Sequence, residues 1–264
     1  MKIKKTVYYE DLLRDDFANN GIRHKPLPEN FKFVHKDPIS GILSFLVYRL
    51  IALPVLWIVG KISKGVIVKG KKNLKSLRHK PVFFYGNHTQ IADAWLVQTT
   101  MTAKKCAIIA NQDATSIPGI RYLVSLLGCV PVPETPEEHK KFVEAIRYHV
   151  KKKHGIVIYP EAHIWPYYTR IRPFGNASFV YPAEMGVPVV PFCVTYRQRK
   201  IFKNASPLMT VHVGKPIYPK MDLPLTARKD ALRGAVYEYM LDKSCEDENV
   251  EYIRYLPKKK EEAK

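Results

Sequence analysis

Short apolar runs alternate with amphipathic segments along most of the chain after residue 65. The runs are too short for buried helices, and Gly, Pro or polar residues bound them, which is typical of strands in a buried sheet. They are Val82–Tyr85, Cys106–Ile109, Ile156–Tyr159, Val187–Phe192 and Met209–Val213. The alternation predicts an α/β fold, in which a mostly parallel sheet is flanked by helices.

Two of the helical segments carry clear start signals. Thr135 is suited to cap a helix, because a proline follows it and Glu138 occupies the third helical position. Phe142 and Ile146 then lie one turn apart on a single apolar face. A second amphipathic helix is predicted from Thr226. Both helices are expected to cover the sheet.

Residues 1–65 differ from the rest of the chain, so we divide it into this N-terminal part and an α/β domain over 66–264 with a basic C-terminal tail. Residues 1–40 are mixed and charged, and we expect an irregular or partly ordered arm there. Residues 41–60 form an apolar run of membrane length with twelve Leu, Ile, Val or Phe residues. Arg49 and Pro54 within it oppose a straight membrane-spanning helix.

The flanks of this apolar run favour one side of a membrane. Residues 21–40 hold four Lys or Arg, and residues 61–80 hold eight with no acidic residue, so neither flank is expected to be translocated. We predict a helix or hairpin lying in the cytoplasmic leaflet, in preference to a full span. A buried hydrophobic helix is the remaining alternative.

The charge of the chain predicts an anionic partner. Its 264 residues include 43 Lys or Arg and 24 Asp or Glu, a formal net charge of +19. Nucleic acid and acidic membrane lipid are the two candidates. The apolar content of 46% argues against disorder as the main state. Acidic residues precede the apolar run, so we expect no cleaved secretory signal.

A histidine and an aspartate follow the first strong strand, where α/β sheets collect their active sites. His88 and Asp93 are five positions apart, or about 140° around a regular helix, so only a turn brings them together. If Asp93 begins a helix, its carboxylate accepts from one ring nitrogen while the other faces a substrate. Such a dyad suits deprotonation of an incoming hydroxyl. The alternative is a loop histidine beside a helix-capping aspartate.

Other chemical motifs are weaker. The chain has no GxSxG sequence, and Gly65–Lys71 resembles a phosphate-binding loop that lacks the Ser or Thr for magnesium. His139, His149 and His154 have no carboxylate or cysteine set at ligand spacing, so we expect surface histidines and no metal site. The four cysteines form no CxxC pair and are expected to be reduced core residues.

The segment Asn87–Asp93 resembles the NHxxxxD signature of the glycerolipid acyltransferases that include 1-acylglycerol-3-phosphate acyltransferase. Three further segments are similar to this family's other blocks and occur in the family's order. They are Leu127–Val132, Val157–Glu161 and Gly186–Phe192. The resemblance extends over roughly residues 66–215.

The resemblance implies roles for the residues that match. His88 would be the general base and Asp93 its orienting partner, with Asn87 and Glu161 at the substrate. The donor would be acyl-CoA or acyl carrier protein, the acceptor a lysophospholipid, and no cofactor or metal is implied. Glu161 would position the acceptor head group.

Two departures from the family pattern concern the acceptor phosphate. Pro131–Pro133 occupy the place where the second block usually ends in an arginine, and the third block lacks its usual Gly, Thr and Arg. Arg170 and Arg172 are candidate replacements, because a guanidinium binds phosphate with two hydrogen bonds. Alternatively they are a solvated pair before a turn.

These observations favour a membrane-surface O-acyltransferase of phospholipid synthesis or remodelling, peripheral or monotopic on the cytoplasmic face. One alternative is a hydrolase in which His88 activates water on a thioester. Another is a nonenzymatic module that binds membranes or nucleic acid, which only the charge supports. No nucleic-acid-binding motif accompanies that charge, so nucleic acid is not expected as a partner.

Overall fold

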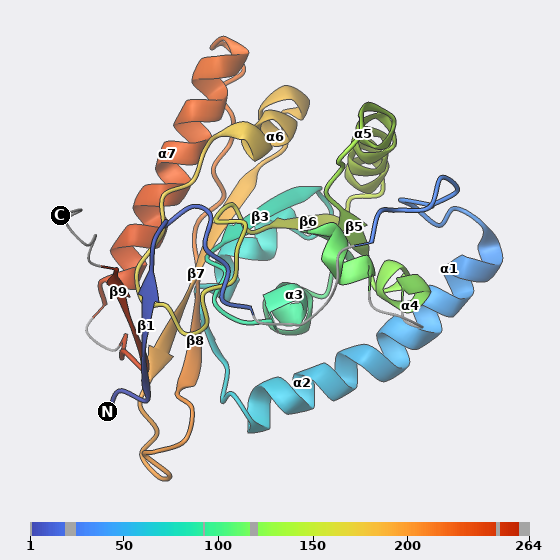
Figure 1. The fold of residues 1–264 in the computed structure, drawn as a ribbon. Coiled ribbons are helices and arrows are strands. Elements are labelled where there is room, and N and C mark those ends of the chain that lie inside the picture. Colours follow the sequence, from blue (N-terminus) through green and yellow to red (C-terminus); the bar gives the residue numbers. More distant parts are fainter. Residues whose placement is uncertain (1, 19–24, 92, 117–120, 247–248, 259–264) are drawn as a thin grey trace, which may run out of the picture.

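The computed structural model describes residues 2–18, 25–91, 93–116, 121–246 and 249–258. Its centre is a seven-stranded sheet in the order β2-β8-β7-β3-β6-β4-β5 (Figure 1). The strands are β2 Ile67–Lys69, β3 Val82–Gly86, β4 Cys106–Ala110, β5 Cys129–Pro131, β6 Gly155–Ile158, β7 Val189–Arg197 and β8 Leu208–Val213. Neighbouring strands run parallel except for the antiparallel pair β7 and β8. The predicted α/β fold with a mostly parallel sheet is confirmed.

Helices cover both faces of this sheet. They are α1 Pro38–Phe45, α2 Leu53–Ile62, α3 Asp93–Leu96, α4 Arg121–Leu126, α5 Pro136–Lys151, α6 Val180–Met185 and α7 Leu225–Ser244. Alternate residues of β3 point to opposite faces, so Phe83 packs in one apolar cluster with α5, α6 and α7, and Phe84 packs in another with α3. Thr135 accepts the Glu138 backbone N–H at the start of α5, which confirms the predicted cap.

The N-terminal arm is more regular than its composition indicates. Strand β1, Lys5–Tyr9, pairs in parallel with β9, Ile253–Pro257, near the other end of the chain. Of the two expectations for the arm, irregular or partly ordered, residues 5–9 agree with partial order, although no strand was predicted there. A five-residue strand with one distant partner has no local pattern that reveals it. Residues 259–264 of the predicted basic tail lie outside the described residues.

Beyond β1, the arm packs on the α/β domain through aromatic side chains. Phe17 of the arm and Tyr255 of β9 both contact Trp165, which is completely buried. The Trp165 indole N–H donates to the Asp15 carbonyl at 2.7 Å. This cluster joins the two ends of the chain over the segment that follows β6.

Residues 38–62 form one continuous helix, in which a π-helical stretch, Leu46–Ala52, links α1 to α2. In the described part of the chain it is the one helix long and apolar enough to cross a membrane, judged by length and composition. Its large apolar side chains are exposed, so the alternative of a buried hydrophobic helix is wrong. They are Ile39, Ile42, Leu43, Phe45, Leu46, Leu50, Ile51, Val55, Trp57, Ile58 and Ile62.

The side of this helix that faces the domain is polar. Ser40 bonds the Tyr122 hydroxyl at 3.1 Å, and Ser44 donates to the Leu126 carbonyl at 2.8 Å. One turn further on, the Tyr48 hydroxyl donates to Gln98 Oε1 at 2.5 Å. The helix thus lies along the domain on the same side as α3 (Figure 1), with its apolar face outward.

Candidate active site

The candidate catalytic residues lie beyond the carboxyl ends of two paired parallel strands. His88 follows β3, Asp93 begins α3, and Glu161 follows β6, which pairs with β3 over Val82–Tyr85. Carboxyl ends of parallel strands share one edge of a sheet, so the topology brings these loops together. The backbone confirms the contact, because the His88 N–H donates to Glu161 Oε2 at 3.2 Å.

Asp93 organises the turn that holds His88. Its Oδ2 atom is 3.1 Å from His88 Nδ1 and accepts the backbone N–H groups of Thr89 at 2.7 Å and Gln90 at 2.8 Å. The carboxylate is completely buried, and within the described residues its Oδ1 atom has no hydrogen-bond partner. Because Oδ2 receives two backbone donors, the proton shared with the ring belongs on His88 Nδ1. The predicted turn between His88 and Asp93 is therefore confirmed.

Tyr159 fixes the plane of the His88 ring. The two rings stack with centroids 4.4 Å apart and planes 17° apart. The Tyr159 hydroxyl donates to the Asp93 carbonyl at 2.5 Å, so one residue contacts both members of the dyad. The His88 side chain retains 16% exposure, and among the described residues its Nε2 atom has no hydrogen-bond partner.

Tyr196 on β7 supports the same turn from the next strand. Its hydroxyl bonds Thr89 Oγ1 at 2.7 Å and accepts the Gln90 side-chain amide at 3.1 Å. Sequence analysis missed Tyr159 and Tyr196 as positioning residues. Tyr159 had a usable signal, since it ends an apolar strand directly before Pro160 and Glu161. Tyr196 had none, because its role depends on the pairing of β3 with β7.

Asn87 lies inside the sheet, not at an open surface. Its side-chain amide donates to the Val194 carbonyl at 3.0 Å, and its carbonyl oxygen accepts the Val194 N–H at 2.7 Å. The side chain therefore replaces a backbone peptide group and extends the pairing of β3 with β7. The predicted contact of Asn87 with substrate is not supported, because both ends of the amide are engaged in the protein.

Glu161 and Arg172 form a buried ion pair next to the turn that holds His88. Both side chains are almost completely buried, with the Arg172 Nη2 atom 3.3 Å from Glu161 Oε2. The Arg172 backbone N–H donates to Glu161 Oε1 at 3.0 Å. Burial raises the pKa of the Glu161 carboxyl, and the guanidinium and two backbone N–H groups oppose that shift.

The surroundings of Arg172 correct one part of the sequence interpretation. Its guanidinium also donates to the carbonyls of His163 and Leu12, and it lies over the Trp165 ring at 5.0 Å. A guanidinium enclosed in this way cannot reach an acceptor phosphate, so that assignment is not supported for Arg172, nor is direct head-group contact for buried Glu161. Arg170 is exposed, and its contact with an acceptor stays a prediction.

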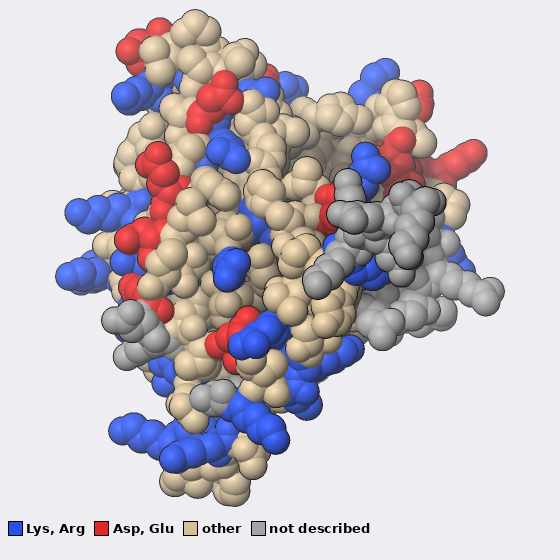
Figure 2. Space-filling view, turned by 60° about the vertical axis from the view of Figure 1, so that its left-hand side comes forward, with Lys and Arg blue, Asp and Glu red and all other residues tan. Residues whose placement is uncertain are grey.

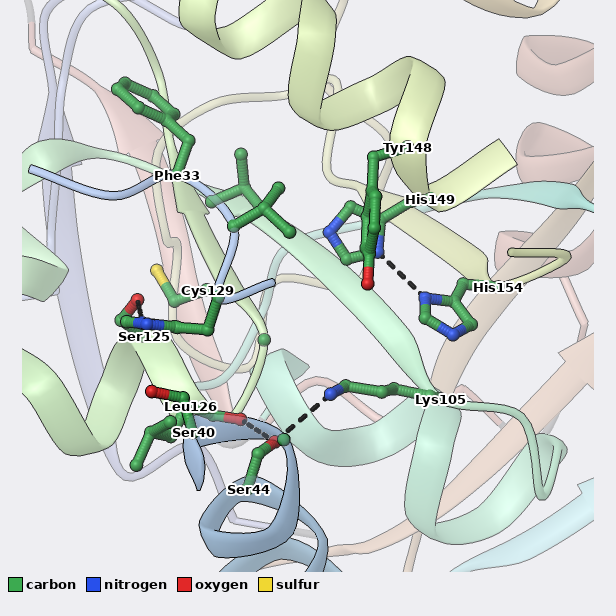
Figure 3. A pocket seen from close by; sticks show the side chains of 15 residues that line it. Phe33, Ser40, Ser44, Lys105, Ser125, Leu126, Cys129, Tyr148, His149 and His154 are labelled. Atoms are coloured by element: carbon green, nitrogen blue, oxygen red, sulfur yellow. Dashed lines mark hydrogen bonds between the residues drawn. The ribbon is translucent and has the colours of Figure 1, made fainter. Parts of the chain in front are cut away.

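Two cavities lie elsewhere in the described residues. One, of about 440 Å³, adjoins Phe31, Lys141 and Glu144. The other, of about 40 Å³, lies at the amino-terminal edge of the sheet, where Lys105 donates to Ser44 Oγ and His149 Nδ1 bonds His154 Nδ1 at 3.0 Å (Figure 3). Neither of these two cavities is lined by His88 or Asp93.

His149 was expected at the surface, and that expectation is wrong. The residue is 5% exposed, and burial lowers the pKa of its ring to about 3, with further lowering by His154 and Lys105. Burial also lowers the pKa of His154 to about 4. His149 lies on the same buried face of α5 as Phe142, about two turns further along the helix. Among the described residues, no group of three or more His, Cys, Asp or Glu side chains is arranged to hold a metal ion.

Comparisons with known proteins give one family match and a similar solved fold. Residues 65–195 match the family model described as Acyltransferase, a range that includes His88, Asp93 and Glu161. The fold is similar to the crystal structure of the 1-acyl-sn-glycerophosphate (LPA) acyltransferase PlsC from Thermotoga maritima. That match has a TM-score of 0.57 and 19% sequence identity, and it covers 78% of this chain and 86% of the other. A comparison with curated protein sequences finds no match.

Proposed function

This chain belongs to the Acyltransferase family through residues 65–195, and on that premise we propose that it transfers a fatty acyl group from an acyl thioester to a lysophospholipid hydroxyl. The donor is acyl-CoA or acyl carrier protein, and the acceptor is a lipid such as 1-acylglycerol-3-phosphate. The observation that carries the proposal is the His88–Asp93 dyad, with Nδ1 held by the carboxylate and Nε2 free. The proposal assigns no cofactor or metal.

His88 acts as the base in the first step. Its Nε2 atom removes the proton of the acceptor hydroxyl as that oxygen attacks the thioester carbonyl carbon. The ring becomes an imidazolium, which the buried Asp93 carboxylate stabilises through the Nδ1 hydrogen bond. Glu161 and Tyr159 hold the backbone and ring of His88 in place and do not contact the reacting atoms.

The same proton completes the second step. The tetrahedral intermediate collapses, the carbon–sulfur bond breaks, and the ester bond remains on the acceptor oxygen. The departing thiolate takes the proton from His88 Nε2, which returns the ring to its neutral form. No described hydroxyl or thiol side chain is hydrogen-bonded to His88, so the proposed transfer is direct, without an acyl-enzyme intermediate.

We place the protein on an anionic membrane surface by way of the helix 38–62. Its exposed apolar face supports insertion into a lipid leaflet, and the hydrogen bonds of Ser44 and Tyr48 tie its other face to the domain. A helix that spans the bilayer would break those bonds. Arg49 donates to the Ala103 carbonyl at 3.1 Å, which directs its charge back to the domain. The basic flanks favour the cytoplasmic face.

The test is a product assay on the purified protein in lipid vesicles. It is given a radiolabelled acyl thioester, as acyl-CoA and in a parallel reaction as acyl carrier protein, with and without lysophospholipids that differ in head group. We expect a diacyl phospholipid to form and thiol release to depend on the acceptor. Thiol release at the same rate without acceptor, with free fatty acid as product, would instead establish the thioester hydrolase.

A further inference from the structure

The loop between β7 and β8 carries at its tip two large apolar side chains that the described part of the chain leaves mostly uncovered. Ile201 is 74% exposed and Phe202 is 78% exposed. Ile39 and Ile62, on the helix of residues 38–62 that we call the membrane helix, are exposed to a similar extent. Phe202 also has a positive φ of 57°, a conformation that bulky residues rarely adopt. Adjacent exposed apolar side chains with a polar rim mark interaction sites, and strained backbone conformations are found at such sites.

Cations surround this tip. Arg197 and Arg199 precede the two apolar residues, Lys200 and Lys203 adjoin them directly, and no acidic residue occurs between positions 185 and 221. Lys200 and Lys203 are exposed. Figure 2 shows Lys and Arg side chains gathered around the lowest part of the molecule, the end where Figure 1 shows the loop between β7 and β8. An apolar tip with a basic rim is complementary to an anionic lipid surface.

Hydrogen bonds fasten the loop to the end of the membrane helix. Arg199 donates to the carbonyl of Ser63, the residue after α2, and through Nε to the Ser206 carbonyl at 2.7 Å. Arg197 donates to the Gly65 carbonyl at 2.8 Å. In Figure 1 the loop continues the line of α1 and α2 along one edge of the molecule. The base of the loop and the end of α2 are therefore joined by hydrogen bonds, which places the tip and the helix along one edge.

We infer that residues 198–207 form a second membrane-contact element, in which Ile201 and Phe202 enter the acyl-chain region while Lys200 and Lys203 bind anionic head groups. The inference rests on the membrane association proposed above, and it does not depend on acyl transfer. Continuity with the helix and the basic rim favour a lipid surface over a protein partner. Two membrane contacts at separate points fix the orientation of the domain relative to the bilayer. With a single helix as the contact, the domain could rotate about the axis of that helix.

The first experiment compares vesicle binding of full-length variants. Ile201→Ser/Phe202→Ser is expected to lower affinity for vesicles that contain anionic phosphatidylglycerol by roughly tenfold or more, since burial of one such side chain alone exceeds a factor of ten. The control is Tyr218→Ser, which removes a 52% exposed aromatic residue beyond the opposite end of β8. Lys200→Gln/Lys203→Gln should weaken binding to anionic vesicles and have little effect on neutral phosphatidylcholine vesicles.

The second experiment measures directly whether the tip of the loop inserts into the lipid bilayer. Cys245 is the exposed cysteine among four, so a Cys245→Ser background allows an environment-sensitive fluorophore to be attached at Phe202→Cys or, as control, Tyr218→Cys. Anionic vesicles should raise and blue-shift the emission at position 202 and leave position 218 unchanged. Unchanged emission at 202 in vesicle-bound protein would overturn the inference, as would emission changes caused by self-association without lipid.

Failure of this inference is distinguishable from failure of the proposed function. Ile201→Ser/Phe202→Ser should keep the wild-type rate with a short-chain, water-soluble acceptor in the absence of vesicles, because neither residue contacts the catalytic loop. A wild-type protein that inserts its tip but transfers no acyl group would contradict only the proposed function. A protein that transfers acyl groups, with position 202 in water, would contradict only the inference.

Discussion

Replacement of Arg172 tests whether this side chain stabilises the fold or binds the substrate. In Arg172→Met the side-chain volume is largely kept, but the buried Glu161 carboxylate loses its guanidinium partner at 3.3 Å. The carbonyls of His163 and Leu12 lose a donor at the same time. Loss of one member of a buried ion pair costs about 3–5 kcal/mol, so we expect a decrease of that size in the free energy of unfolding.

A double variant measures the interaction between Glu161 and Arg172. Glu161→Gln/Arg172→Met removes both charges, so it should lose less stability than the sum of the two single variants, by about 1–3 kcal/mol. Urea unfolding at equilibrium measures these differences. Arg170→Gln is the matched control, because Arg170 is exposed, and its unfolding free energy should stay within about 0.5 kcal/mol of wild type.

The kinetics of Arg172→Met give an independent readout. Glu161 accepts the His88 backbone N–H, so loss of its partner should displace the base and lower kcat, with little change in KM for the lysophospholipid. The reasoning would be refuted by an Arg172→Met protein of wild-type stability and kcat, with a raised KM for the lysophospholipid alone. That result would return Arg172 to the acceptor phosphate.

Three further variants examine the same account. Asp93→Asn should keep the turn, because an amide oxygen can replace Oδ2, but acyl transfer should fall about 10²- to 10⁴-fold in a steady-state assay. Asn87→Ala should lower the unfolding free energy by about 2 kcal/mol or more in urea titrations, since both peptide groups of Val194 lose a partner. In the folded state the pKa of His149 is about 3, below its ordinary value of 6.5. The contribution of its neutral ring to the free energy of unfolding is therefore complete above pH 6.5 and is lost as the pH falls towards 3. Between about pH 7 and about pH 5.5, wild type should therefore lose roughly 1 kcal/mol more than His149→Gln, as measured by unfolding at each pH.

Sequence analysis identified the parts of the fold that depend on local pattern. The apolar runs fixed the positions of β3, β4 and β6 to within one residue, and the Thr135 signal located the start of α5. Strands β1 and β9 were missed, because their pairing depends on hydrogen bonds between distant segments and not on periodicity. For the same reason the arm was expected to be irregular or partly ordered, with no strand.

The candidate site divides in a similar way. Spacing and position predicted that a turn joins His88 to Asp93, and the structure has that turn. The interpretation of Arg172 as a phosphate ligand rested on its residue type and its place in the sequence. Its burial follows from a tertiary arrangement, in which the N-terminal arm and Trp165 cover it, and no local pattern reports that arrangement.

The most direct test of the central claim is the rate of acyl transfer by His88→Ala, measured with acyl-CoA and 1-acylglycerol-3-phosphate in anionic vesicles. Vesicle binding and the unfolding transition of the same preparation serve as controls. We expect both controls to match wild type, while the rate falls by about 10²- to 10⁴-fold, the usual contribution of a positioned general base. Retention of more than roughly a tenth of the wild-type rate, well outside that range, would contradict the account.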